Sequence, residues 1–317
     1  MDFLQLAGGF IYLLMGADLL VRGSVALARR LGIPSVFVAL TVVALGTSLP
    51  ELVVAVRAAV IGVPGLVLGN SVGSNIANVF LVIGASAMIH PLVSDDPQVR
   101  RDSVVMILVS LLLIGLCRDG GLRTGDAAIL LVAMLIVTIT TLRAAGRERE
   151  SERSAPVEWV LGLPSQRRMI TLFIAAGLVG LPVGARMVVE SSVRIAAELG
   201  VSNALVGLTV VAFSTSLPEL ATTGVAAYQK RTEMALGTVV GSNILNIVAI
   251  LGVAGLASRD PIPVPTSFFV MDFPVMIAAS VLLAAFAWRR KPVGRMAGGF
   301  MFTAYVVYIL AVFVTAA

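Results

Sequence analysis

Long stretches of apolar residues recur along almost the whole chain. Each is about 20 residues long, which is the length that an α-helix rising 1.5 Å per residue needs to cross a hydrocarbon core roughly 30 Å thick. The alternating ten-residue strands that are typical of membrane β-barrels are absent from the sequence. The pattern therefore predicts an all-α polytopic membrane protein with ten transmembrane helices, at residues 3–28, 34–60, 66–90, 103–117, 124–142, 169–197, 203–228, 234–257, 267–288 and 296–315.

The composition supports a lipid environment and excludes several kinds of site. The chain has 317 residues, of which 58% are hydrophobic and 13% are charged, whereas a soluble domain usually carries about 25% charged residues. A single histidine and a single cysteine exclude a multi-histidine zinc site, a disulfide framework and a thiolate metal cluster. The sequence has no Walker A loop, so we expect neither direct ATP drive nor any other cofactor.

The basic residues are distributed unevenly between the predicted loops. If the N-terminus is outside, the cytoplasmic loops hold 16 Lys and Arg residues and the opposite loops hold three. Such an excess is typical of cytoplasmic loops, so the net charge of +5 reports topology and predicts no nucleic-acid partner. We expect both termini outside, residues 143–168 as a cytoplasmic linker, and a place in a prokaryotic cell (inner) membrane. The sequence indicates no particular oligomeric state.

The chain contains two copies of one unit. Residues 16–84 align without gaps on residues 184–252 at a constant offset of 168, and 31 of the 69 aligned pairs are identical. The copies are an odd number of predicted crossings apart, so they must be inverted, as in many secondary transporters. The predicted organisation is a first five-helix half, a linker and a second five-helix half, with one repeat motif in each half, at residues 1–142, 143–168, 169–317, 40–84 and 208–252.

Each repeat places a proline and a glutamate in the middle of a predicted span. Pro50 precedes Glu51 in the string GTSLPE, and Pro218 precedes Glu219 in STSLPE. A proline inside a helix frees the carbonyl four residues earlier, and an unpaired carbonyl in hydrocarbon is costly unless it lines a cavity or coordinates an ion. A charged side chain at the bilayer centre costs about 2.5–3.5 kcal/mol on translocon scales, so the two glutamates indicate a counter-charge.

Hydroxyl and amide side chains accompany each glutamate at helical spacing. The next predicted helix of each unit carries a G-S-N-x-x-N string, whose serine and second asparagine share one face. In a purely structural interpretation, these residues hold helices together through hydrogen bonds and the proline only kinks its helix. A glutamate in both copies instead favours an oxygen-rich site for Ca²⁺ or Na⁺. The residues that accompany the glutamates are Thr47, Ser48, Ser74 and Asn78 in the first copy and Thr215, Ser216, Ser242 and Asn246 in the second.

The paired strings GTSLPE…GSNIAN and STSLPE…GSNILN resemble the two alpha repeats of the cation/calcium exchanger superfamily, which includes the sodium/calcium exchangers. The resemblance implies an antiporter rather than an enzyme, with Na⁺ and Ca²⁺ as substrates and the lipid bilayer as its surroundings. It also implies alternating access, with the first and sixth helices sliding against the other eight. It assigns Glu51 and Glu219 as central Ca²⁺ ligands, and it adds as ion ligands Thr47, Thr215, Ala44, Ala212, Ser48, Ser216, Ser74, Ser242, Asn78 and Asn246.

One position departs from the family's pattern. Many of these exchangers carry Asp where this chain has Asn246, so the predicted centre contains two carboxylates instead of three. The coupling ion therefore stays open between Na⁺, H⁺ and K⁺, and the cargo between Ca²⁺ and another divalent cation. An ion channel and an intramembrane enzyme are the alternatives of other classes. Inverted duplication argues against the channel, and the single histidine, which lies outside the repeats, argues against the enzyme.

Overall fold

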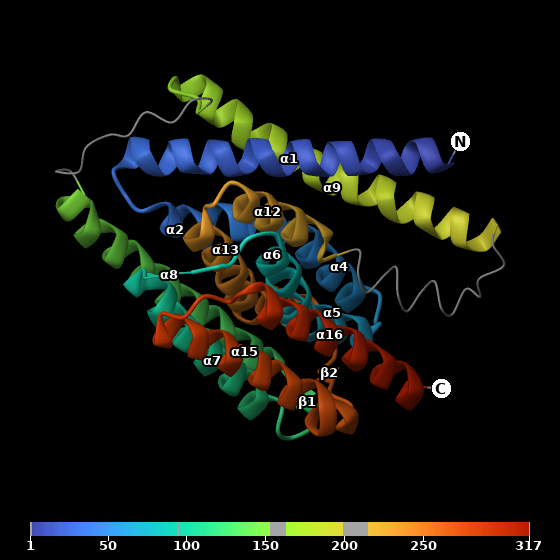
Figure 1. The fold of residues 1–317 in the computed structure, drawn as a ribbon. Helices are drawn as coiled ribbons and strands as arrows, with labels where there is room; N and C mark the ends of the chain where they lie inside the picture. Colours follow the sequence, from blue (N-terminus) through green and yellow to red (C-terminus); the bar gives the residue numbers. More distant parts are fainter. Residues whose placement is uncertain (1, 94, 153–162, 199–214, 317) are drawn as a thin grey trace.

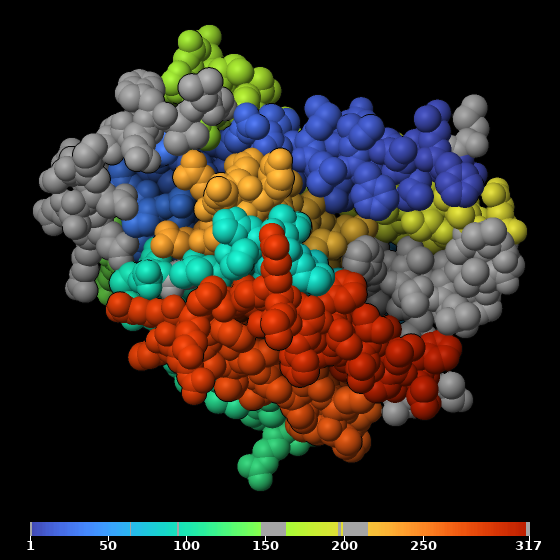
Figure 2. Space-filling view, viewed as in Figure 1, coloured from blue at the N-terminus to red at the C-terminus, as the bar shows by residue number. Residues whose placement is uncertain are grey.

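The computed structural model describes residues 2–93, 95–152, 163–198 and 215–316, and this part of the chain is almost entirely helical (Figure 1). Two long helices, α1 (Asp2–Leu31) and α9 (Arg167–Glu198), cross each other on one side of a body built from the remaining helices. In the space-filling view of Figure 2, α1 lies along the upper edge of the body, above the segment that contains α12. The prediction of an all-helical membrane protein is confirmed at this level.

Glycines allow α1 and α9 to pack backbone against backbone. Gly9 and Gly16 are two helical turns apart on α1, and Gly177 and Gly184 have the same spacing on α9. A Cβ atom added at Gly16 would lie 2.9 Å from a main-chain nitrogen of α9, and one added at Gly184 would lie 2.6 Å from a main-chain nitrogen of α1. The close approach of the two helices therefore depends on the missing side chains, as in other small-residue helix contacts in membranes.

The body contains the described remainder of both sequence repeats. Several of its helices include π-helical turns, which often occur at functional sites. In the first half of the chain its elements are α2 (Ser35–Val38), the π-helix η1 (Ala39–Val43), α3 (Ala44–Thr47), α4 (Leu49–Val60), α5 (Pro64–Ala77), the π-helix η2 (Asn78–Ile83), α6 (Gly84–Ile89), α7 (Pro97–Leu116) and α8 (Thr124–Glu152). In the second half they are α12 (Leu217–Tyr228), α13 (Thr232–Leu245), the π-helix η4 (Asn246–Leu251), α14 (Gly252–Ala257), the π-helix η5 (Phe268–Asp272), α15 (Phe273–Arg289) and α16 (Arg295–Ala316).

The element boundaries repeat with the same offset as the sequence. Adding 168 to the bounds of α4, α5, η2 and α6 gives the bounds of α12, α13, η4 and α14 in turn. Even the π-helical turn begins at the corresponding asparagine in both copies, Asn78 and Asn246. The second copy of α2, η1 and α3 would fall in residues 203–215, of which all but residue 215 lie outside the described residues. The duplication is therefore a property of the backbone as well as of the sequence.

Seven of the described helices, or eight if the bent segment 35–60 is one span, are long and apolar enough to cross a membrane. Two of the ten predicted spans are not among them. The predicted span 203–228 lies partly outside the described residues, and α7 carries Arg100, Arg101 and Asp102 near its start. Helix α8 continues to Glu152, past its predicted end at residue 142, because the charged residues that follow the apolar stretch are good helix formers.

Two short β contacts lie beyond what the helical pattern predicted. Strands β1 (Gly121–Leu122) and β2 (Ile262–Pro263) pair antiparallel, and Leu92 forms a bridge with Val293. Both contacts join a loop of the first half to a loop of the second half. Large apolar side chains are exposed around the body, including Leu142, Phe300 and Val314. A surface of this kind is stable in lipid rather than in water.

Candidate cation-binding site

The predicted span 34–60 is broken at Ser48. Helix α3 ends at Thr47, α4 begins at Leu49, and the two parts of the span meet at an angle of 45°. Pro50 therefore lies in the first turn of a new helix, where its missing N–H has no partner to lose. The prediction of a proline inside one continuous helix is wrong. Ser216 has nearly the same backbone angles as Ser48, so α12 begins in the same way in the second repeat.

The break places each glutamate at the N-terminus of a helix, where the helix dipole favours negative charge. Glu51 lies in the first turn of α4 and Glu219 in the first turn of α12, and each is only 1% exposed. Both carboxylate oxygens of Glu51 and Oε2 of Glu219 are buried without a hydrogen-bond partner in the described part of the chain. Two buried carboxylates with three unpaired oxygens are costly unless a positive charge compensates them.

The first repeat contacts the glutamate of the second repeat directly. The hydroxyl of Ser48 donates a hydrogen bond of 3.3 Å to Oε1 of Glu219. Glu51 and Glu219 lie close enough for their charges to repel each other. The N-terminal ends of α4 and α12, which carry the glutamates, therefore point at one shared region between the repeats.

Four asparagines join the two repeats through reciprocal hydrogen bonds. Asn75 donates its side-chain amide to the main-chain oxygen of Asn243 at 3.1 Å, and Asn243 donates to the main-chain oxygen of Asn75 at 3.2 Å. Asn78 donates to Oδ1 of Asn243, and Asn246 donates to Oδ1 of Asn75, both at 3.0 Å. Each contact has a partner displaced by 168 residues in both members, which is the signature of a local two-fold axis. We call this set the asparagine clasp.

The clasp fixes the orientation of its side chains. The amide nitrogens of Asn75 and Asn243 face main-chain oxygens, which accept but cannot donate, so their Oδ1 atoms must be the acceptors for Asn246 and Asn78. The Oδ1 atoms of Asn78 and Asn246 are left over. Both are buried without a donor among the described residues, and they come from π-helices that contact the opposite glutamate helix, η2 with α12 and η4 with α4.

The remaining predicted residues are buried to different degrees. The hydroxyls of Ser216 and Ser242 are buried without a hydrogen-bond partner in the residues that the structure describes. Ser74 and Ala44 are buried, and Thr215 is half-buried. Ala212 lies outside the described residues. The predicted residues thus contribute seven buried oxygens that lack a donor: Glu51 Oε1 and Oε2, Glu219 Oε2, Asn78 Oδ1, Asn246 Oδ1, Ser216 Oγ and Ser242 Oγ.

Sequence reasoning missed the partner role of Asn75 and Asn243. Both belong to the G-S-N-x-x-N strings and are identical in the two copies, which was the available signal. Their role appears only when the two repeats are placed face to face, because each of their bonds crosses from one repeat to the other. They orient the predicted ligands Asn78 and Asn246 rather than offering oxygens of their own.

The donor set is suited to a hard cation. It contains two carboxylates and several neutral oxygens, and the described residues include no group of three or more His, Cys, Asp and Glu side chains that could hold a metal ion. Ca²⁺ takes 6–8 oxygen ligands in flexible geometry, and Na⁺ also prefers oxygen. Two carboxylates exactly balance one divalent charge, so the arrangement can bind one divalent cation without a residual charge in the low-dielectric interior.

Comparisons with known proteins agree with this chemistry. The family model described as sodium/calcium exchanger protein matches residues 1–143 and 169–314. The inner membrane protein YrbG of Escherichia coli is 33% identical over 305 residues, which cover 95% of this chain and 93% of that protein. The sodium/calcium exchanger MaX1 of Methanosarcina acetivorans is 30% identical, with 98% of each chain covered. A structure of the sodium–calcium exchanger NCX_Mj soaked with Na⁺ and Sr²⁺ superimposes with a TM-score of 0.83, at 32% identity and with 98% of this chain and 97% of that chain covered.

Proposed function

Because this chain belongs to the sodium/calcium exchanger family, we propose that it is a secondary active antiporter that exchanges Na⁺ for Ca²⁺ across the membrane by alternating access. The observation that carries the proposal is the set of seven buried oxygens, contributed by both repeats, that have no hydrogen-bond donor among the described residues. Such a set is unfavourable by itself and becomes favourable when a cation with oxygen ligands enters. The antiporter thus binds its substrate with groups that the described part of the chain leaves without a partner.

We assign the central Ca²⁺ to the two carboxylates. Glu51 and Glu219 neutralise its charge, and Oδ1 of Asn78 and of Asn246 complete the centre from the other two helices of the site. The main-chain oxygens of Thr47 and Thr215 lie beside the two carboxylates. Na⁺ binds in flanking sites that are completed by carbonyl or hydroxyl oxygens of Ala44, Ser48, Ser74, Ala212, Ser216 and Ser242. Since the same two carboxylates balance the charge of both kinds of ion, the two substrates compete, which is the requirement for exchange.

The proposed architecture is ten transmembrane helices arranged as two inverted five-helix repeats. The constant offset of 168 residues in the element boundaries and the two-fold symmetry of the asparagine clasp support this arrangement. Both termini lie outside, and the linker 143–168 is cytoplasmic, according to the distribution of basic residues. The membrane is the cell (inner) membrane, in agreement with the name of the relative from Escherichia coli.

Alternating access requires that one part of the molecule move against the rest. We take the pair α1 and α9 as the moving part, because the two helices pack closely against each other at glycines and lie together on one side of the body (Figure 1). A polar contact links the pair to the body: Gln229, at the end of α12, donates a hydrogen bond of 2.7 Å to Asp18, which also pairs with Arg22 on α1. This contact can be exchanged for water when the pair slides.

The presence of Asn246 limits which groups of the site could couple transport to H⁺. Its amide nitrogen is bound to Asn75, so this position carries neither a charge nor a proton that can be released. Two glutamates remain as the groups that can titrate, which leaves coupling to H⁺ as the alternative, together with K⁺-assisted exchange and a different divalent cargo. These alternatives keep the fold and the site and change only the driving ion or the cargo.

The test is uptake of ⁴⁵Ca²⁺ into proteoliposomes that are loaded with Na⁺ and diluted into Na⁺-free buffer. We expect rapid uptake that depends on internal Na⁺ and that is lost in Glu51→Gln, which removes one of the two balancing charges. Vesicles loaded with K⁺ and vesicles given a pH jump serve as controls for the coupling ion. Arg118→Gln, at an exposed position outside the site, is the matched control variant.

Each outcome has a distinct meaning. Uptake driven only by the pH jump or by K⁺ would replace Na⁺ as the coupling ion and leave the site in place. Wild-type uptake in Glu51→Gln would contradict the assigned site. A conductance that needs no counter-ion would identify a channel and would refute exchange altogether.

A further inference from the structure

A groove lies away from the proposed cation site, at the surface between two helices of the body. Its volume is about 480 Å³, and it lies where the start of α7 meets the end of α15. Two arginines and a tryptophan surround it, and its floor is formed by apolar side chains of α7. We call it the arginine groove, and its principal lining residues are Arg100, Arg101, Val104, Val105, Leu108 and Trp288.

Arg101 is held in position by a buried carboxylate. Its Nε donates a hydrogen bond of 3.0 Å to Asp102, which is only 2% exposed and also accepts a bond of 2.6 Å from Gln98. A second guanidinium nitrogen of Arg101 donates to the hydroxyl of Thr141 on α8 at 3.4 Å. The guanidinium is therefore fixed at the groove, with its other donors available.

Arg100, unlike Arg101, has a guanidinium nitrogen without a hydrogen-bond acceptor. Its Nε atom is buried and has no acceptor within the described part of the chain, and no carboxylate there forms an ion pair with it. The nearest carboxylate that acts on its charge is that of Asp96, at the start of α7. A buried guanidinium nitrogen without an acceptor carries a desolvation cost, and an anionic group that reaches it would remove this cost.

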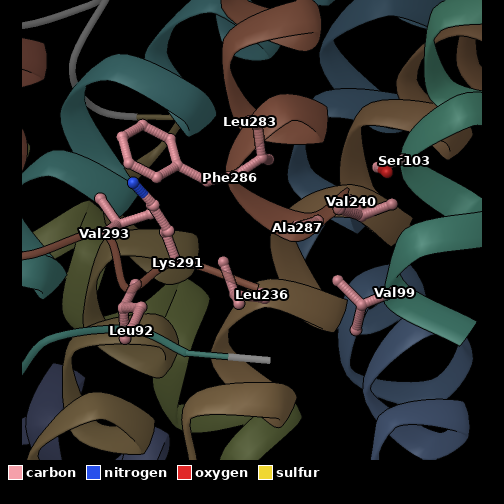
Figure 3. A pocket seen from close by; sticks show the side chains of 10 residues that line it. All are labelled: Leu92, Val99, Ser103, Leu236, Val240, Leu283, Phe286, Ala287, Lys291 and Val293. Carbon is pink, nitrogen blue, oxygen red and sulfur yellow. The ribbon is translucent and has the colours of Figure 1, made fainter. Parts of the chain in front are cut away.

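The groove opens on the outer side of the seam between α7 and α15. On its inner side the seam between α7 and α15 is closed, because Val99, Ser103, Leu283 and Ala287 leave a cavity of only about 10 Å³ beside α13 (Figure 3). On its outer side the seam is open, since Leu108 and Trp288 are 58% and 60% exposed. An occupant therefore enters the groove from this exposed side.

We propose that the arginine groove binds an anionic phospholipid. The phosphate of the headgroup lies between Arg100 and Arg101, and an acyl chain follows the apolar side chains of α7 from Val104 to Leu108. Charge complementarity favours a phosphate, since arginine binds it with two parallel hydrogen bonds. The apolar floor and the tryptophan, a residue enriched at the membrane interface, favour a lipid over a soluble anion.

The position of the groove agrees with the basic residues around it. Trp288 is followed directly by Arg289, Arg290 and Lys291, and such clusters next to membrane helices attract anionic lipids. We place this lipid site in the inner leaflet, and this placement rests on the topology that is part of the proposed function. The lipid site itself does not depend on which ions the protein exchanges.

The test measures lipid binding to the purified full chain by native mass spectrometry, with phosphatidylglycerol and phosphatidylcholine as probes. We expect phosphatidylglycerol to be retained in preference to phosphatidylcholine, and we expect Arg100→Gln to weaken its binding about five-fold, the effect of about one basic residue near the membrane surface. Arg118→Gln, which makes the same change of charge near the other end of α7, should bind as the wild type does. Trp288→Leu, at an exposed position, provides a second variant that should fold normally and bind more weakly.

Three results would overturn the proposal. Equal retention of the two lipids would remove the charge selectivity on which it rests. Unchanged binding of phosphatidylglycerol in both Arg100→Gln and Trp288→Leu would place the lipid elsewhere. Competition by inorganic phosphate at equal concentration would show that the groove recognises a soluble anion. None of these readouts involves Ca²⁺ flux, so a failure here and a failure of the proposed exchange are distinguishable.

Discussion

The asparagine clasp makes a prediction that follows from its symmetry. Asn75→Ala removes two hydrogen bonds to asparagines of the second repeat, one donated to the main-chain oxygen of Asn243 and one accepted from Asn246, together with a weak bond of 3.9 Å donated to Sδ of Met276. Asn243→Ala removes the two corresponding bonds, one donated to the main-chain oxygen of Asn75 and one accepted from Asn78, together with a weak bond of 3.5 Å donated to Sδ of Met106. The two substitutions therefore leave equivalent buried groups unpaired, although they lie in different halves of the chain.

The magnitude follows from the number of bonds. Hydrogen bonds between membrane helices contribute about 0.6 kcal/mol on average and up to about 1.7 kcal/mol, so each substitution should cost about 1–3 kcal/mol of stability. The double variant removes the bonds of both single variants, but the two residues are in contact within one network, so its loss of stability should differ from the sum of the two single effects. Each variant also frees the amide of one predicted ligand, which should weaken Ca²⁺ binding.

The assay is thermal unfolding of the purified variants in detergent, with and without Ca²⁺. We expect equal decreases in the midpoint for the two single variants and a smaller stabilisation by Ca²⁺ than in the wild type, because stabilisation by a ligand grows with its affinity. Ser110→Ala is the control, since the buried hydroxyl of Ser110 bonds only within its own helix. Clearly unequal decreases in the unfolding midpoint for Asn75→Ala and Asn243→Ala would refute the inference that the two halves of the clasp are equivalent.

Three further substitutions test the site and the moving pair. Glu219→Gln should abolish Na⁺-dependent ⁴⁵Ca²⁺ uptake while the protein remains folded by size-exclusion chromatography; uptake at the wild-type rate would contradict its role as a central ligand. Asn246→Asp exchanges a donor for an acceptor 3.0 Å from Oδ1 of Asn75, so we expect a changed pH and Na⁺ dependence of transport, and identical profiles would count against this. Gly184→Val should separate the two long helices, since a Cβ atom there lies 2.6 Å from a main-chain nitrogen of α1, and it should lower the transport rate at least ten-fold. Gly115→Val, where a Cβ atom has no neighbour within 4 Å, should transport normally, and an equal loss in both would point to a general effect of valine in these helices.

The repeat could be predicted because the two copies are identical at polar residues as well as at apolar ones. Glu51 and Glu219 occupy matching places in two strings that apolar character alone would not preserve, and the structure buries both at the start of a helix. The long apolar stretches likewise indicated a helical membrane protein, since only lipid accommodates so many exposed apolar side chains. These features depend on residue type and spacing, which the sequence contains directly.

Other features depend on contacts between distant parts of the chain. The break at Ser48 is a choice between a kinked helix and two helices, and both are compatible with a proline two residues later. The partners of Asn75 lie 168 and 171 residues away, so no local pattern could identify them. The arginine groove also escaped prediction, because Trp288 and Arg100 meet only when α7 and α15 pack together.

The reciprocal bonds of the clasp also bear on how such a chain can arise. An interface in which each side offers the same groups to the other is self-complementary, so two separate copies of one half can form it as well as two linked halves can. In a membrane this requires the copies to insert with opposite orientations, and the linker then needs only to keep them together. The clasp thus has the geometry of a contact between two identical copies of one half of the chain.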